Sequence, residues 1–260
     1  MKLSVLSENC AGGRFFAEHG LSYLIDLGER KILFDTGHSD VFLRNAALLG
    51  IDIQNQVDLV VLSHGHWDHG NGLKYLHDKT IIVHPAAFIR RFRKGGNLNI
   101  GLELSKLEIQ SRFKLIESQE PYRIAENIIF AGGVPRNSEF ESKTTQFIDE
   151  GGNEDFVPDD SALIIIEDNE LTIISGCAHS GICNIIEYAK IITGLDKVRT
   201  VIGGFHLKEV DDQILKTVEY FCQSGIKNII PSHCTELPAL CMFYQKFAIK
   251  QLKTGQVLTL

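Results

Sequence analysis

Residues 57–72 read VDLVVLSHGHWDHGNG, and this stretch decides the fold. Its opening part is almost entirely apolar, which predicts a short buried strand at 57–62. Four side chains that can bind a metal ion follow directly: His64, His66, Asp68 and His69. In an extended segment residues i and i+2 point to the same side, so the imidazoles of His64 and His66 can reach one cation. The stretch therefore predicts a metal site at the end of a buried strand.

The second half of this stretch predicts a second cation beside the first. Asp68 and His69 fall where the chain must turn, and Gly65, Gly70 and Gly72 are expected to supply the backbone freedom for that turn. Imidazole and carboxylate ligands suit two divalent ions, zinc first, with iron or manganese as alternatives. A structural zinc site usually has four ligands, often cysteines. This cluster has more ligands than one such ion needs, which favours an open catalytic centre.

The rest of the chain predicts an α/β protein with mixed sheets and helices outside them. Several apolar strands end in a loop that carries histidine, and in α/β folds ligands collect outside the carboxyl ends of strands. The expected strands are 2–6, 21–27, 31–35, 57–62, 81–83, 163–166, 171–174, 201–202, 229–230 and 257–260, and the expected helices are 39–49, 73–77, 185–192, 214–222 and 237–248.

Length and composition narrow the class of protein. The chain has 260 residues, 44% of them hydrophobic and 23% charged, which suits one domain over 1–260. An insertion is expected at about 86–115, where the basic run 90–94 should form a solvated helix face, although its arginines could bind phosphate. The net charge of −7 argues against a nucleic-acid partner. Without an apolar leader or membrane-length run, a cytoplasmic location is expected.

Two more histidines follow predicted core strands. His179 comes after the strand at 171–174, and this place favours a role as a metal ligand over a histidine satisfied within a tight turn. His206 comes after the strand at 201–202 and is expected to bind substrate, to transfer protons or to complete the metal shell. The six cysteines contain no C-x-x-C pair, so a disulfide framework is not expected. Cys234 is expected to pack rather than to bind metal.

The run at 64–69 is similar to the H-x-H-x-D-H signature of the metallo-β-lactamase superfamily, and D-T-G at 35–37 looks like the segment that precedes it. The resemblance covers nearly the whole chain. It implies an α/β fold, an αββα four-layer sandwich of two mixed β-sheets with helices outside. It also implies a final ligand, which His233 matches, and a bridging aspartate where this chain has Cys177. Either Cys177 or His179 would then complete the site.

Three further motifs resemble one branch of that superfamily: GCAHSGICNI at 176–185, GGFHL at 203–207 and PSHCT at 231–235. This branch contains the archaeal 7,8-dihydropterin-6-methyl-4-(β-D-ribofuranosyl)aminobenzene 5'-phosphate synthase. AGGVPR at 131–136 looks like the same branch, and its Arg136 is expected to bind the phosphate of a substrate.

These features predict a metal-dependent hydrolase that acts on a small anionic, phosphorylated molecule through a metal-bound hydroxide. Asp68 would position or deprotonate the nucleophile, and His206 would protonate the leaving group. The alternative is a transferase that condenses a dihydropterin diphosphate with an aminobenzene ribosyl phosphate and releases diphosphate. An iron-dependent oxidoreductase is less favoured because its relatives usually carry a carboxylate where His66 stands. A nuclease is less favoured because basic residues are not in surplus.

Overall fold

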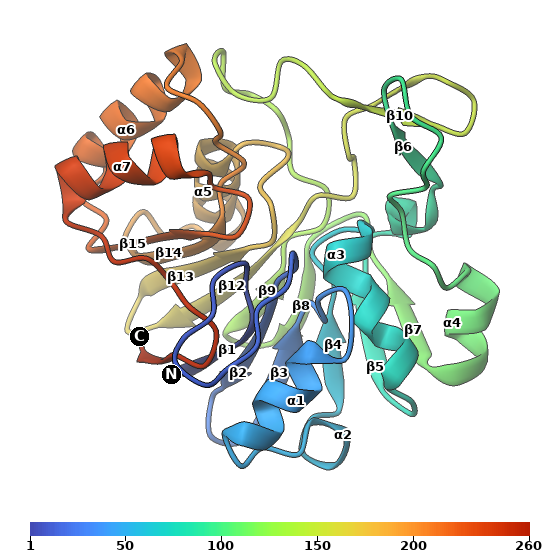
Figure 1. Ribbon diagram of the computed structural model, residues 1–260. Coiled ribbons are helices and arrows are strands. Elements are labelled where there is room, and N and C mark those ends of the chain that lie inside the picture. Colours follow the sequence, from blue (N-terminus) through green and yellow to red (C-terminus); the bar gives the residue numbers. More distant parts are fainter. The chain divides into compact units, whose positions relative to one another are not determined.

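A computed structural model describes residues 1–260, which divide into two units, each with its own main sheet (Figure 1). Unit 1 comprises residues 1–119, 146–155 and 253–260, and unit 2 comprises 120–145 and 156–252. The expected α/β architecture is confirmed in both units, because each combines a mixed sheet with helices. The insertion expected at 86–115 stays a prediction.

Unit 1 is built on a seven-stranded sheet in the order β16-β1-β2-β3-β4-β5-β7. Neighbours from β16 to β3 pair antiparallel, whereas β3, β4, β5 and β7 pair parallel. The carboxyl ends of β3 and β4 therefore lie at one edge. The strand bounds are Lys2–Ser7 (β1), Ser22–Asp26 (β2), Lys31–Phe34 (β3), Leu59–Val61 (β4), Thr80–Val83 (β5), Lys114–Glu117 (β7) and Val257–Thr259 (β16).

Short helices complete unit 1, and their apolar side chains share a core with the sheet. Phe42, Leu73 and Ile109 from three helical segments pack with Leu33 and Val60 of the sheet. The expected helix at 73–77 is a 3-10 helix that begins earlier. The helix bounds are Val41–Leu48 (α1), Ile53–Gln56 (α2), Trp67–Gly70 (α3) and Lys106–Arg112 (α4), with 3-10 helices at Asn71–Tyr75 and Pro85–Phe88.

The basic run at 90–94 does not form the expected helix face. It lies in β6 (Arg91–Arg93), which belongs to a three-stranded sheet with β10 (Phe147–Asp149) and β11 (Glu154–Asp155). The Arg91 side chain is fully buried, and its Nε donates to Asp155 Oδ2 at 2.6 Å. A buried charge needs a buried partner. Arg91 is therefore part of the structure of this small sheet.

Unit 2 is built on a six-stranded sheet in the order β15-β14-β13-β12-β9-β8. β13, β14 and β15 are parallel, and the other neighbours are antiparallel. The bounds are Tyr122–Ala125 (β8), Ile128–Phe130 (β9), Ala162–Glu167 (β12), Glu170–Ser175 (β13), Val198–Gly204 (β14), Asn228–Ser232 (β15), Ile182–Thr193 (α5), Asp212–Ser224 (α6) and Leu237–Phe247 (α7).

The three helices of unit 2 lie on one face of its sheet (Figure 1). Ile185 of α5, Phe221 of α6 and Phe243 of α7 are buried in one apolar cluster with Ile173 and Val201 of the sheet. α5 and α6 both end at a glycine in the left-handed region, where a residue without Cβ is favoured. The strand–helix alternation expected for this part of the chain is confirmed.

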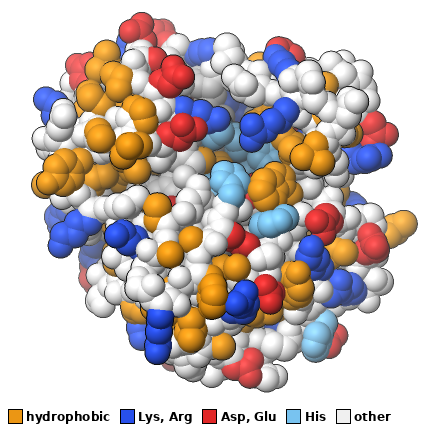
Figure 2. All heavy atoms as spheres, in the orientation of Figure 1, with side chains coloured by type: hydrophobic (Ala, Val, Ile, Leu, Met, Phe, Trp, Pro, Cys, Tyr) orange, Lys and Arg blue, Asp and Glu red, His pale blue; other side chains and the backbone are white.

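Two features would suggest a particular partner: a membrane-spanning helix and a surface area of one charge sign. None of the helices has both the length and the apolar character needed to cross a bilayer. Acidic and basic side chains are interspersed on the face shown in Figure 2, without a broad area of one sign.

Candidate metal-binding residues

The four predicted residues of the 64–69 run lie close together in unit 1 and form what we call the histidine group: His64, His66, Asp68 and His69. His64 Nε2 lies 3.0 Å from His66 Nδ1, and the rings of His64 and His69 are 4.2 Å apart. Each of the four side chains is buried. Four polar side chains crowded out of water are costly unless they bind something, which makes this group a candidate metal site.

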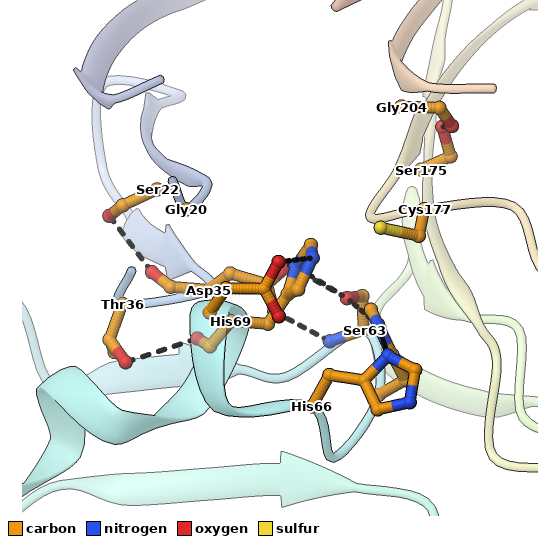
Figure 3. A network of polar contacts seen from close by, with 12 residues as sticks. Gly20, Ser22, Asp35, Thr36, Ser63, His66, His69, Ser175, Cys177 and Gly204 are labelled. Atoms are coloured by element: carbon orange, nitrogen blue, oxygen red, sulfur yellow. Dashed lines mark hydrogen bonds and ion pairs between the residues drawn. The ribbon is translucent and has the colours of Figure 1, made fainter. Parts of the chain in front are cut away.

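A buried carboxylate orients the histidine group. Asp35 follows β3, and its Oδ2 lies 2.7 Å from His69 Nδ1 (Figure 3). The Ser63 backbone N–H and hydroxyl donate to the two oxygens of Asp35, each at 2.7 Å. The same hydroxyl is 2.9 Å from His64 Nδ1. Asp35 therefore fixes His69 directly and His64 through Ser63.

This arrangement holds Nδ1 of His69 against Asp35 and Nδ1 of His64 against Ser63. A histidine that binds metal usually donates its other N–H to a carboxylate or carbonyl, as His69 can to Asp35. Burial lowers the pKa of His64 well below its ordinary value, and nearby His69 and His66 lower that pKa further. A neutral imidazole is the form that binds metal. The local chemistry of the histidine group thus fits a divalent cation.

The glycines of the run have a different role from the one predicted. Gly65, Gly70 and Gly72 are not among the residues with positive φ, so the turn does not need their backbone freedom. The turn needs glycine at these positions because other parts of the chain come too close for a side chain. A Cβ on Gly65 would lie 1.9 Å from Ala87 O, and one on Gly72 would lie 2.2 Å from Thr36 O. Close backbone approach, rather than unusual dihedral angles, explains these residues.

Sequence reasoning missed His19, which contacts the histidine group. His19 Nε2 lies 3.1 Å from Asp68 Oδ2, and the His19 side chain is about half exposed (51%). Its ring lies 5.5 Å from that of Trp67, which also meets His38 edge-on at 4.5 Å. No motif surrounds His19 in the sequence, so only the fold reveals this contact. Ser63 was likewise missed, and Asp35 was noted only as part of the D-T-G resemblance.

Unit 2 holds a second set of donors at the carboxyl ends of its parallel strands. Cys177 follows β13, His206 follows β14, and Cys234 follows β15. One ligand atom from each lies within 4.8 Å of the other two. We call these three residues the thiol group. Burial raises the pKa of the Cys234 thiol, but hydrogen bonds with Cys177 and His206, together with the charges of His206 and His233, lower this pKa well below its ordinary value.

The two other predicted ligands of unit 2 lie next to the thiol group. The His179 ring is 4.3 Å from the His206 ring, and His233 directly precedes Cys234. Both His179 and His233 are buried. Arg136, predicted to bind phosphate, donates from Nη1 to His179 O at 2.7 Å and from Nη2 to Phe156 O. In this structure Arg136 therefore holds the turn that carries His179.

Comparisons with known proteins agree with the motifs. A family model for the metallo-beta-lactamase superfamily matches residues 16–192. An uncharacterized protein of Methanocaldococcus jannaschii is 38% identical over 250 residues, which cover 94% of this chain and 94% of that protein. The 7,8-dihydropterin-6-methyl-4-(beta-D-ribofuranosyl)-aminobenzene-5'-phosphate synthase of the same organism is 33% identical over 285 residues, covering 99% of this chain and 96% of the synthase.

A solved structure gives the same result. The crystal structure of a metal-dependent hydrolase of the beta-lactamase superfamily matches with a TM-score of 0.87 at 32% identity, covering 100% of this chain and 99% of that one. The resemblance and the fold class predicted from the sequence are confirmed by these matches.

Proposed function

Because this chain belongs to the metallo-β-lactamase superfamily, we propose that it is a metal-dependent hydrolase of a small anionic, phosphorylated molecule. The observation that carries the proposal is the buried histidine group, whose imidazoles are oriented by the Asp35 carboxylate. The related structure of a metal-dependent hydrolase supports the hydrolytic reaction. A phosphorylated substrate is supported by the related synthase, whose name includes a ribofuranosyl phosphate.

We propose two divalent ions, zinc in the first place. A bound divalent cation makes water more acidic and neutralises charge on a phosphoryl oxygen. Metal ions of this class need neutral imidazole, thiolate or carboxylate donors, and the chain supplies all three. The proposed ligands are His64, His66, Asp68 and His69 in unit 1, and Cys177, His179 and His233 in unit 2.

Asp68 has a second proposed role, as the group that holds the attacking water and accepts its proton. Asp68 is buried, with its side chain only 9% exposed, so few bulk water molecules reach it. His19 lies 3.1 Å from Asp68 Oδ2 and keeps that carboxylate in place. A positioned base near the nucleophile contributes typically 10²- to 10⁴-fold to rate. The substrate-binding role of Arg136 and the cytoplasmic location stay predictions.

The second candidate function is the transferase. It is favoured by the 33% identity to the dihydropterin synthase along nearly the whole of both chains. Here an aryl carbon or amine of the acceptor attacks the pterin methylene, the carbon–oxygen bond to diphosphate breaks, and the acceptor loses a proton. Asp68 would accept that proton instead of one from water. The two candidates thus use the same residues and differ in the nucleophile.

One experiment separates the two candidates. The metal-loaded protein is incubated with a dihydropterin diphosphate, with and without an aminobenzene ribosyl phosphate. Organic products are identified by mass spectrometry, and released phosphate and diphosphate are measured. Hydrolysis gives product without the acceptor, whereas transfer gives a coupled product only when both substrates are present. A metal-loaded protein that consumes neither this diphosphate nor a panel of phosphate esters contradicts the proposed substrate class.

A further inference from the structure

The parallel strands of unit 2 align three potential ligands at one edge. In the register of these strands Ser175 pairs with Gly203, and Gly204 pairs with Ser232. Cys177, His206 and Cys234 each stand two residues beyond the end of their strand. The ends of β14 and β15 are level, and the end of β13 is one residue short of them. The three side chains therefore converge, and their ligand atoms lie within 4.8 Å of one another.

The backbone at this edge is shaped to let the two sulfur atoms approach. A Cβ on Gly204 would lie 2.5 Å from Cys234 Sγ and 3.2 Å from Cys177 Cα, so only glycine leaves room there. Cys234 Sγ donates to Cys177 O at 3.5 Å. Ser175 Oγ donates to Gly204 O at 3.0 Å, which ties the ends of β13 and β14 together beside Cys177 (Figure 3).

All three turns at this edge carry backbone strain. Ala178, next to Cys177, and His206 itself have φ of 53° and 51°, in the left-handed region that side chains with a Cβ seldom adopt. His233, next to Cys234, has φ of 51° as well. Strained residues of this kind persist where the surrounding structure holds them, and they cluster at functional sites. Three such residues follow three neighbouring strands, so this edge is a candidate functional site.

His206 supplies an independent observation. Its Nδ1 is buried and has no hydrogen-bond partner. A buried polar atom without a partner is costly, and a native structure seldom keeps one without a reason. Neither of the neighbouring cysteines, Cys177 and Cys234, forms a disulfide. A cation that binds an imidazole and two sulfur atoms would explain the histidine and both thiols together.

We propose that Cys177, His206 and Cys234 bind one divalent cation and that their two sulfur ligands select zinc over manganese or magnesium. Zinc–sulfur bonds of about 2.3 Å and zinc–nitrogen bonds of about 2.0–2.1 Å place tetrahedral donors roughly 3.5–4 Å apart. The present separations, all within 4.8 Å, come near that range. Thiolate ligands favour zinc, whereas carboxylate and water ligands suit magnesium and manganese. The role of His206 thus becomes that of a ligand, and Cys234 binds metal instead of only packing.

Cobalt(II) binding tests this proposal, which rests on the proposed metal dependence but not on the proposed reaction. Metal-free protein is titrated with Co²⁺, and the near-ultraviolet charge-transfer absorbance of thiolate–cobalt bonds is recorded. Histidine and carboxylate ligands give no such band, so the histidine group does not contribute to the signal. We expect C177S and C234S each to lose about half of the band and the double variant to lose all of it.

Two further variants complete the test. C222S removes an exposed thiol on α6 and should leave the band unchanged. H206A keeps both sulfur ligands but should weaken Co²⁺ binding at least about tenfold, since even outer partners of a ligand contribute 10- to 100-fold. Circular dichroism of each metal-free variant checks its folding. In the zinc protein, X-ray absorption should show two sulfur neighbours at about 2.3 Å.

The outcomes separate this inference from the proposed function. If the band of C234S is as strong as that of the wild type, Cys234 is not a ligand and only packs, and the proposal is overturned. A folded wild-type protein without any thiolate band at saturating Co²⁺ also overturns it, even when the enzyme turns over a phosphorylated substrate. A thiolate band that follows the three variants as expected supports the proposal, even when every tested phosphate ester is left intact.

Discussion

The histidine group and the thiol group differ in how the chain builds them. The histidine group comes from one short run, and a buried carboxylate, Asp35, orients its imidazoles. The thiol group takes one residue from each of three parallel strands, and strand register and strained turns set its geometry. The first group lies within six consecutive residues, whereas the second is brought together by strand order and register. Metal binding by the histidine group should therefore depend mainly on its side chains. Metal binding by the thiol group should depend as much on its backbone as on its side chains.

The largest expected effect comes from H66A in the histidine group. Removing one imidazole from a set this compact should abolish metal binding there, and activity should fall by more than about 10²-fold, because even outer partners of metal ligands contribute 10- to 100-fold. Metal analysis and turnover are measured on the same preparation. H77A, which removes an exposed histidine, is the matched control and should keep both properties. Activity that persists in metal-free H66A protein contradicts the metal-dependent mechanism.

The next effect tests the orienting carboxylate. D35N keeps the shape of Asp35 but replaces one of the two oxygens that hold Ser63 and His69. We expect metal affinity to fall by about 10- to 100-fold, as for other outer partners of ligating histidines. A competition titration with a chelator measures this affinity.

Asp78 provides a closely matched control for D35N. It also has positive φ, at 53° against 57° for Asp35, and its Oδ2 also lies beside a histidine ring, 2.9 Å from His77 Nδ1. Asp78 is exposed, and asparagine tolerates the left-handed region at both positions. Equal metal affinity in D35N, D78N and the wild type would show that Asp35 does not orient the ligands.

The same contrast explains what the sequence could predict. His64, His66, Asp68 and His69 could be found because four potential ligands follow one apolar strand within a few residues. Most strands and long helices were also predicted, since their apolar runs and periodic patterns are local. The buried Arg91–Asp155 pair could not be predicted, because it joins residues far apart in the chain and a basic run usually lies in solvent. The glycines were recognised as important, but for the wrong physical reason.

The thiol group shows the limit of sequence reasoning more sharply. His206 was singled out by its place after a predicted strand and Cys177 by the family resemblance, but Cys234 was assigned to packing. A lone cysteine after a strand is most often a small buried hydrophobic residue. Its approach to Cys177 depends on the order and register of β13, β14 and β15, and on the missing side chain at Gly204. None of these is visible in a single sequence.

A smaller effect is expected at the edge of the histidine group. H19A removes the partner 3.1 Å from Asp68 Oδ2. Because His19 is half exposed, the contact should contribute about 1 kcal/mol or less, so kcat should fall by about fivefold or less. Metal content should stay unchanged, and H19Q, which keeps a donor, should recover part of the loss. Loss of metal in H19A would place His19 among the ligands instead.

The last comparison concerns stability, where the smallest effect on activity is expected. Glu141 is a carboxylate that supports backbone in unit 2 as Asp35 supports imidazoles in unit 1. Glu141 accepts the N–H groups of Cys183 and Asn184 at the start of α5, at 3.0 and 2.9 Å. It packs so closely on Gly181 that a Cβ there would lie 2.5 Å from Oε2. Burial raises the pKa of Glu141, although these backbone hydrogen bonds oppose the rise.

A carboxyl group whose pKa is higher in the folded protein binds more protons there than in the unfolded chain. Its contribution to stability is then fully present below the ordinary pKa of 4.5 and is lost as pH rises through the folded pKa of Glu141. E141Q cannot titrate, so the free energy of unfolding of the wild type should fall relative to that of E141Q as pH rises above about 4.5. One proton limits this slope to about 1.4 kcal/mol per pH unit. Denaturant unfolding between about pH 4.5 and 7.5 measures it.

E139Q is the control for this last comparison, because Glu139 is an exposed glutamate two residues from Glu141. Its stability should follow the wild type across the pH range. Glutamine at 141 offers only one oxygen to two backbone N–H groups, so E141Q should start from a lower stability at acidic pH and narrow the gap as pH rises. Parallel curves for E141Q and the wild type would mean that Glu141 titrates alike in both states. Unit 2 would then be held at α5 by hydrogen bonds alone, with no part played by the burial of charge.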